Sequence, residues 1–200
     1  MAAEAEARMP EARITEEMIE EMRRKIGLKL RIEHSIFNEE ATRMAILKFA
    51  DGIGDPNPLW RDPEYAKTTS YGTLVAPPSW VFSVFAGVQF GWRGLGGFHK
   101  ATEVEFYRPV RLGDKITPEC IFTGFEGPKP SKFAERMVVD WYENRYYNQR
   151  GELVARARWS VVRVERAKAR EKGKYHNLQL PHPWTDEELR KIEEECYPRR

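Results

Sequence analysis

Apolar residues recur with a helical period in the first quarter of the chain. Thr15 can cap a helix whose apolar residues return every four positions, and Gly27 ends it. Residues 28–32 alternate between apolar and charged side chains, which predicts a short strand. Asn38 precedes a second apolar pattern of helical period and is expected to cap the next helix. The N-terminal part is therefore predicted to be mainly helical.

The middle of the chain holds an apolar run without a polar face. Residues 79–90 read SWVFSVFAGVQF, and a helix that is apolar all round has no face to turn to water. Because the run is longer than a usual strand, we predict a buried helix over it. Before it, two glycines and two prolines within residues 51–58 predict a loop, and Asp62 with Pro63 predicts the start of a short helix.

From residue 98 onward the apolar period changes to two. Four alternating runs predict strands, at residues 101–107, 115–123, 133–147 and 153–164. Residues 127–130 and 148–151 have turn composition, and strands joined by short turns favour an antiparallel sheet. Helices followed by strands indicate an α+β fold, in which the sheet wraps around the apolar helix. The charged run 165–174 predicts a solvated linker, and Thr185 opens a last helix through a capping box.

Composition and charge argue against several classes of function. The chain has 200 residues, of which 41% are hydrophobic, and its net charge of +2 indicates no basic face for nucleic acid. The longest apolar stretch, 80–90, is about half of the ~20 residues that span a bilayer, so no membrane partner is expected. Cys120 and Cys196 form neither a CxxC pair nor a disulfide framework, which favours a reducing cytoplasm. The sequence also lacks the usual metal-binding motifs.

Four segments collect the residues that suit chemistry, at 54–62, 71–79, 98–99 and 108–114. Each segment has an ordinary structural interpretation. Asp55 between glycine and proline is typical of a turn, and a histidine that starts a strand, as His99 does, is more often packed than catalytic. Asp114 ends a hairpin turn and is expected to be structural.

Taken together, the order and spacing of these segments resemble the MaoC-like dehydratases, which are hot-dog-fold hydratases and dehydratases of acyl thioesters. The family's GDxNP loop stands here as GDPNP, its D-P-x-Y-A helix as DPEYA, and its RPVxxGD turn as RPVRLGD, at residues 54–58, 62–66 and 108–114. The sequence VAPP at residues 75–78 most resembles the FAS1-like, or N-terminal MaoC, branch of the family. The resemblance implies a hot-dog body over 28–165, with a helical extension at 1–27 and a charged tail at 166–200.

The resemblance also implies water addition or removal across the α,β double bond of an acyl-CoA or acyl-carrier-protein thioester. In the family, the aspartate of GDxNP and a histidine five residues later act on water, while N–H groups at the start of the central helix polarise the thioester oxygen. Here the aspartate is Asp55, but the histidine position is Trp60, whose indole has no accessible base. The usual oxyanion glycine is replaced by Pro77, which has no N–H.

The candidate site residues follow from these matches and departures. We expect Asp55, with His99 from the neighbouring strand, to be the catalytic pair. Substrate contacts are expected from the loop and the start of the central helix, at Asn57, Trp60, Ala76, Ser79 and Trp80. No metal and no cofactor are expected, because the thioester is itself the substrate.

Three hypotheses remain open from the sequence. The chain is one subunit of a two-chain enzyme whose second MaoC-like chain carries a complete Asp/His set, or a self-sufficient homo-oligomeric hydratase that uses Asp55 and His99, or a non-catalytic binder of acyl thioesters. A hot-dog protomer leaves a sheet edge unpaired, so a homodimer or a heterodimer is expected.

Overall fold

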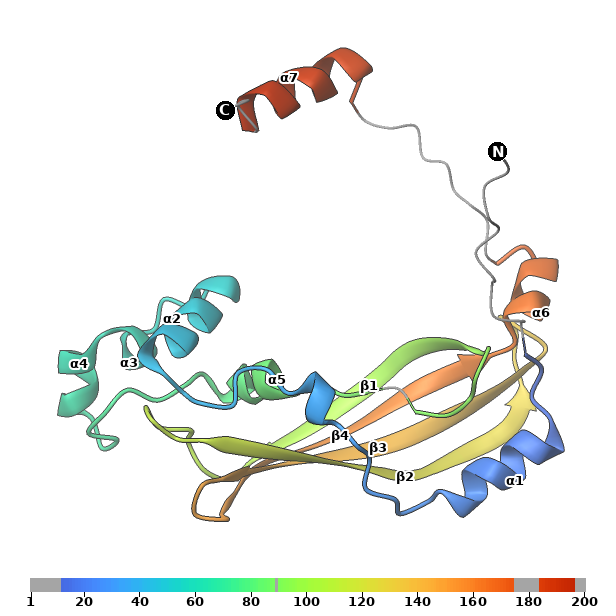
Figure 1. The fold of residues 1–200 in the computed structure, drawn as a ribbon, viewed down its shortest axis with the longest axis horizontal. Coiled ribbons are helices and arrows are strands. Elements are labelled where there is room, and N and C mark those ends of the chain that lie inside the picture. The colour runs from blue at the N-terminus through green and yellow to red at the C-terminus, as the bar shows by residue number, and fades with distance from the viewer. Residues whose placement is uncertain (1–11, 89, 175–183, 197–200) are drawn as a thin grey trace.

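A computed structural model describes residues 12–88, 90–174 and 184–196, and a long antiparallel sheet is its main feature (Figure 1). The strands are β1 (Gly96–Phe106), β2 (Ile116–Pro130), β3 (Arg136–Asn148) and β4 (Leu153–Val164). The helices are α1 (Glu16–Arg24), α2 (Arg43–Gly52), α3 (Pro58–Arg61), α4 (Pro63–Thr68), α5 (Val81–Val84), α6 (Arg166–Glu171) and α7 (Asp186–Cys196), with two short 3₁₀ turns, η1 (Glu33–Ser35) and η2 (Pro78–Trp80).

The sheet has the strand order β1-β4-β3-β2, with every neighbouring pair antiparallel. Helices α2, α3 and α4 gather beyond one end of the sheet, α5 lies over its middle, and α1 lies beside β2 towards the other end (Figure 1). The predicted α+β class is confirmed. No helix of the described residues is long and apolar enough to cross a bilayer.

Register decides which side chains face α5. Because side chains alternate between the two faces of a strand, Tyr142 of β3 and its partner Trp159 of β4 share the face that packs against the helices. Trp159 pairs in turn with Thr102 of β1. We call this the inner face of the sheet. The hydrophobic core on the inner face extends to α1, because Ile19 and Met22 of that helix are buried in the same hydrophobic cluster as Tyr142 and Trp159.

The central helix is much shorter than predicted. Helical backbone covers only η2 and α5, and Phe85 is already extended. The Phe85 carbonyl, which a longer helix would bond to its own backbone, instead accepts a hydrogen bond of 2.6 Å from Tyr146 Oη. Gly87 then adopts a φ of +134°, which is outside the helical region. The predicted helix over 79–90 is therefore wrong beyond Val84, because contacts with the sheet replace its hydrogen bonds.

The other expected helix limits have mixed outcomes. Thr15 caps α1 and Asp62 caps α4, as predicted. Helix α2 is capped by Thr42 rather than Asn38, because the segment around Asn38 is extended and bonds to Ser83. The charged run at 165–174 contains α6, which buries Ala169, and is not a simple linker. The capping box of Thr185 and Glu188 is confirmed at the start of α7.

Two predicted strand features also differ from the structure. Residues 28–32 form no named strand, although the backbone of Leu30 donates to Cys120 at 2.8 Å and pairs this segment with the edge of β2. Residues 127–130 are not a turn, because β2 continues through them with a register shift that marks a bulge. The domain limits remain predictions.

Candidate functional site

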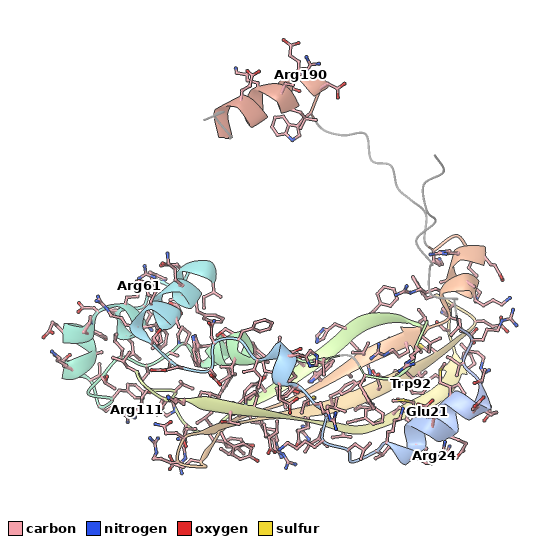
Figure 2. All side chains as sticks on the ribbon, viewed as in Figure 1. Glu21, Arg24, Arg61, Trp92, Arg111 and Arg190 are labelled. Atoms are coloured by element: carbon pink, nitrogen blue, oxygen red, sulfur yellow. The ribbon has the colours of Figure 1, made fainter. Side chains whose placement is uncertain are left out.

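Two hollows flank α5, and the sequence motifs surround one of them. The first hollow, the Trp60 pocket, has a volume of about 300 Å³. It lies at the end of the molecule where Arg61 and Arg111 are found (Figure 2). The Trp60 pocket is lined by Leu59, Trp60, Tyr71, Val75, Ala76, Pro78, Val81, Phe106, Tyr107, Arg108, Pro109, Val110 and Val154.

The second hollow, the His99 groove, is larger and lies on the inner face beside the edge strand. Its volume is about 570 Å³. The groove is lined by Phe82, Ala86, Gly87, His99, Thr102, Val104, Trp159 and Val161. Along β1, Val104 of the groove and Phe106 of the Trp60 pocket are neighbouring positions on one face, so the two hollows adjoin the same stretch of strand.

The loop that carries Asp55 is held by its own short-range hydrogen bonds. Asp55 Oδ1 accepts from the backbone N–H of Asn57 at 3.0 Å, and Asn57 Oδ1 accepts from the backbone N–H of Leu59 at 3.0 Å. Asn57 thereby caps α3, in which Pro58 occupies the first turn. Both residues perform turn and cap roles, and neither lines either hollow.

Trp60, which the sequence resemblance is expected to place at the histidine position of the family motif, lines the pocket. The residue is half-buried on α3, and its Nε1 is buried with no hydrogen-bond partner among the described residues. Because indole nitrogen donates but does not accept a proton, Trp60 supplies shape and a possible donor, but no base.

The start of the central helix offers few backbone donors. The N–H of Ala76 is bonded to the carbonyl of Val110 at 2.8 Å, and neither Pro77 nor Pro78 has an N–H. Ala76 lines the Trp60 pocket. Ser79 is half-buried and Trp80 is completely buried in the core, and neither of them lines either hollow.

His99 lies in the groove and not in the pocket near Asp55. A bulge at the step from His99 to Ala101 brings both His99 and Thr102 to the inner face, although three positions separate them. His99 is exposed, and its Nε2 lies 2.8 Å from Thr102 Oγ1. The structure therefore places His99 in the groove and Asp55 in a loop that lines neither hollow, and their joint role stays a prediction.

The segment 108–114 connects β1 to β2 and is not the predicted hairpin turn, because these two strands lie at opposite edges of the sheet. Asp114 nevertheless makes the structural contacts that were expected of it. Asp114 is buried, and its Oδ2 accepts from the backbone N–H of Arg111 at 2.8 Å. Its Oδ1 accepts from Gln149 Nε2 at 3.0 Å, which ties this turn to the β3–β4 turn. Arg111 also donates to the Tyr71 carbonyl at 2.6 Å, and so holds the wall of the Trp60 pocket.

The floor of the groove rests on residues that no motif indicated. Asp140 and Arg163 form a buried ion pair with an Nε–Oδ2 distance of 2.8 Å, and the Tyr142 hydroxyl donates to the same carboxylate oxygen at 2.8 Å. Burial raises the pKa of Asp140 against the opposing effect of Arg163, and burial also raises the pKa of Tyr142. The only sequence signal was the alternating pattern of β3 and β4, which marks a buried face but no function.

The charged side chains of the two hollows offer no metal site. In the part of the chain that the structure describes, no three His, Cys, Asp or Glu side chains gather so that they could hold a metal ion. The remaining nucleophile in the core, Cys120, is buried, and burial raises its pKa from 9.0 to about 12. The lining of the two hollows can therefore bind an apolar ligand with a few polar contacts.

Comparison with known proteins supports the fold and the reaction class. A family model described as the FAS1-like, dehydratase domain region matches residues 31–157. A UPF0336 protein from Streptomyces avermitilis is 33% identical over 142 residues, which cover 67% of this chain and 88% of that protein. An (R)-specific enoyl-CoA hydratase from Aeromonas caviae is 29% identical over 107 residues, which cover 52% of this chain and 75% of that protein.

Solved structures agree with the predicted hot-dog fold. An (R)-hydratase from A. caviae involved in PHA biosynthesis matches with a TM-score of 0.53 and 25% identity, over 68% of this chain and 94% of that one. The ChsH1–ChsH2 complex from Mycobacterium tuberculosis shares the fold, with a TM-score of 0.59 and 15% identity over 74% and 90% of the two chains. The hot-dog prediction is confirmed.

Proposed function

The chain belongs to the FAS1-like dehydratase family of MaoC-like hot-dog proteins, and from this premise we propose that it holds an acyl thioester as one subunit of a two-chain hydratase or dehydratase. The reaction adds water to a 2-enoyl thioester or removes water from a 3-hydroxyacyl thioester. The second subunit, another MaoC-like chain, supplies the complete acid–base pair. The thioester is the substrate, and no further cofactor is required.

The observation that carries the proposal is Trp60 in the wall of the pocket. A side chain without a base stands where the family motif places its proton-transfer histidine. The nearby helix start has Pro77 and Pro78 in place of backbone donors, so an oxyanion that develops on the thioester finds few fixed N–H groups there. Two parts of the catalytic machinery are thus absent around an otherwise well-formed pocket, as expected of a subunit that binds substrate for its partner.

The lining of the two hollows suits the two parts of an acyl thioester. The Trp60 pocket has apolar walls and one arginine, Arg108, whose side chain is about half exposed. We place the thioester end of the substrate here and the acyl chain towards the apolar residues of the His99 groove. Burial of the chain would contribute ~0.8 kcal/mol for each methylene removed from water.

We place the interface with the second subunit at the edge strand β1. Among the residues that the structure describes, β1 pairs with β4 alone, so no described strand covers its outer edge. Phe98 and Phe106 of this strand and the following Tyr107 are exposed aromatic residues. Since the His99 groove opens beside the same strand, a partner on this edge would also bring its own residues next to the bound acyl chain.

The test compares the isolated chain with the chain purified together with a second MaoC-like chain that carries a complete Asp/His set. We expect the isolated chain to bind an acyl-CoA without hydrating trans-2-octenoyl-CoA, and the two-chain complex to hydrate it. Trp60→Ala in the complex should raise KM more than it lowers kcat, because the indole contacts substrate but transfers no proton. Full hydratase activity of the isolated chain would contradict the subunit arrangement.

A second candidate function rests on His99, which lines the groove and has an exposed imidazole. A self-sufficient homo-oligomer would use Asp55 and His99, contributed to one site by two copies. In that case Asp55→Asn and His99→Ala would each lower the turnover of the isolated chain by orders of magnitude. Acyl-CoA binding without turnover in any combination of chains would instead identify a non-catalytic binder.

A further inference from the structure

Three buried side chains form a continuous hydrogen-bonded relay beneath the His99 groove. Trp159 Nε1 donates to Asn144 Oδ1 at 3.1 Å, and Asn144 Nδ2 donates to Tyr146 Oη at 3.3 Å. Tyr146 Oη then donates to the backbone carbonyl of Phe85 at 2.6 Å. Asn144 and Tyr146 are 0% exposed, so each bond is made where water cannot replace it.

The relay connects two opposite sides of the groove. Trp159 is a lining residue contributed by β4, and Phe85 directly precedes the lining residues Ala86 and Gly87. The register explains the geometry, because Asn144 pairs with Ala157 and therefore lies diagonally across from Trp159 on the inner face. One amide side chain thus sets both the orientation of an indole and, through Tyr146, the position of a backbone segment.

Ring stacking as well as the hydrogen bond to Asn144 orients the indole of Trp159. Tyr142 stacks on it with ring centroids 4.3 Å apart and planes 14° apart. The Tyr142 hydroxyl bonds to Asp140, and it accepts from the backbone N–H of Phe90 at 3.3 Å. The segment 85–90 is therefore attached to the sheet at both of its ends by tyrosine hydroxyls.

Gly87 shows how closely the two sides approach each other. A Cβ atom at Gly87 would lie 2.8 Å from Cζ2 and 3.1 Å from Cε2 of Trp159, which is closer than real Cβ atoms come to a neighbour. The φ of +134° at Gly87 also disfavours any side chain. The indole and the backbone at Gly87 therefore lie close together in the lining of the groove.

We infer that Asn144 and Tyr146 are positioning residues that fix Trp159 against Gly87 and so set the length of acyl chain that the groove accepts. The inference rests on the proposed function, because it assigns the groove to the acyl chain. Trp159 is the residue that limits the chain, and the relay holds it in place. A carboxylate or a primary alcohol at the end of the chain would be disfavoured, since the donors and acceptors of the relay are already paired with one another.

The test measures binding of straight-chain acyl-CoAs from butanoyl to hexadecanoyl to the full chain by calorimetry. For the wild type we expect affinity to rise about fourfold per methylene and then to stop rising at a definite length. Trp159→Phe should move this limit to longer chains, because it removes part of the ring that closes the groove. Gly87→Ala should also change the limit, because its Cβ would clash with the Trp159 indole and force the indole or the backbone at residue 87 to move.

Two further variants separate positioning from general stability. Asn144→Leu and Tyr146→Phe should weaken the discrimination between chains on either side of the limit at least tenfold, because Trp159 then has more than one orientation. Val139→Ala is the matched control, because Val139 is equally buried but alternates with Val138 and Asp140 and therefore faces away from the groove. It should lower stability in urea without moving the limit.

The outcomes distinguish failure of the inference from failure of the proposed function. A wild type that binds no acyl-CoA overturns the proposed function and this inference together. A wild type that shows a length limit which stays in place in both Trp159→Phe and Gly87→Ala overturns the inference alone. If Asn144→Leu does not fold, Tyr146→Phe still decides, because it removes only the hydroxyl that joins Asn144 to the Phe85 carbonyl.

Discussion

The Trp60 pocket and the His99 groove lie on either side of α5, yet they are built in different ways. The loop beside the pocket is held by hydrogen bonds between residues two or three positions apart, such as that from Asn57 N–H to Asp55. The groove is held by bonds across strands, such as that from Trp159 to Asn144, fifteen positions apart. A local site leaves a motif in the sequence, whereas a site assembled across strands leaves only an alternating pattern.

The same difference should appear in stability. The groove rests on buried, mutually dependent polar groups, while the pocket rests on half-exposed caps and one ion pair near the surface. Removing one member of a buried pair leaves its partner desolvated and unpaired, but removing an exposed partner returns the other group to water. The following predictions test this contrast, from the largest effect to the smallest.

Arg163→Leu should lower the free energy of unfolding by ~3–5 kcal/mol, because it leaves the Asp140 carboxylate buried without its ion-pair partner. Urea denaturation measures the effect. The double variant Asp140→Leu/Arg163→Leu should recover much of the loss, since it removes the buried charge as well. A single variant as stable as the wild type would show that the groove does not depend on this network.

Alkaline pH should destabilise the groove side of the molecule. Burial raises the pKa of Tyr142 and of Tyr146 above the ordinary tyrosine value of about 10, so the unfolded chain loses these protons first. The stability contributed by these groups is complete below about pH 10 and falls above it by ~1.4 kcal/mol per pH unit for each tyrosine. Cys120, with a pKa raised from 9.0 to about 12, should begin the decline near pH 9.

The measurement for this prediction is the free energy of unfolding in urea at pH 8, 9, 10 and 11. Above pH 10, Tyr146→Phe should make the fall in the free energy of unfolding less steep by ~1.4 kcal/mol per pH unit, which is the contribution of one tyrosine. Cys120→Ala should abolish the part of the decline between pH 9 and 10. A stability that is level from pH 8 to 11 would contradict the burial of these groups.

Asn57→Ala should cost about 1 kcal/mol, because it removes the N-cap of α3. It should also weaken acyl-CoA binding several-fold, since Trp60 is carried by that helix. Thr15→Ala is the matched control, because it removes the cap of α1, which lines neither hollow. If both variants lose the same stability but only Asn57→Ala loses acyl-CoA binding, the result supports the Trp60 pocket as part of the substrate-binding site.

Arg61→Ala should have the smallest effect, below ~1 kcal/mol. Its guanidinium pairs with Asp51 at 2.7 Å, but 35% of the arginine side chain and 44% of the aspartate side chain are exposed. Exposed pairs of this kind contribute little because water and salt screen them. A loss in the free energy of unfolding as large as that of Arg163→Leu would contradict the expected difference in stability between the two hollows.

Local signals predicted the parts of the fold that local forces hold. The caps at Thr15 and Asp62 and the capping box at Thr185 are formed within three residues, and the structure has all three. The end of the central helix was not predictable in this way, because Tyr146 decides it from sixty-one positions away. The bulge before Ala101, which turns His99 to the inner face, has no local sequence signal either.

The residues of the candidate site likewise fall into those that a local motif predicted and those that depend on the register of the strands. Ala76 and Trp60 line the pocket that the motif marks, and the absence of a base at Trp60 was readable from the sequence. Trp159, Asn144 and Tyr146 were read only as parts of strands, because their joint function depends on register and not on spacing along the chain. The sequence also could not show that His99 lines the groove while Asp55 lines neither hollow, because this depends on the order of the strands.

The sequence by itself determined the α+β class and the alternation that makes a sheet with one buried face, and its motifs indicated the hot-dog family. It could do so because side-chain period, caps and motifs act over a few residues. The tertiary structure alone decided where the central helix ends and which side chains close the groove. These features depend on hydrogen bonds and contacts between distant strands, whose free energy is available only after the chain has brought them together.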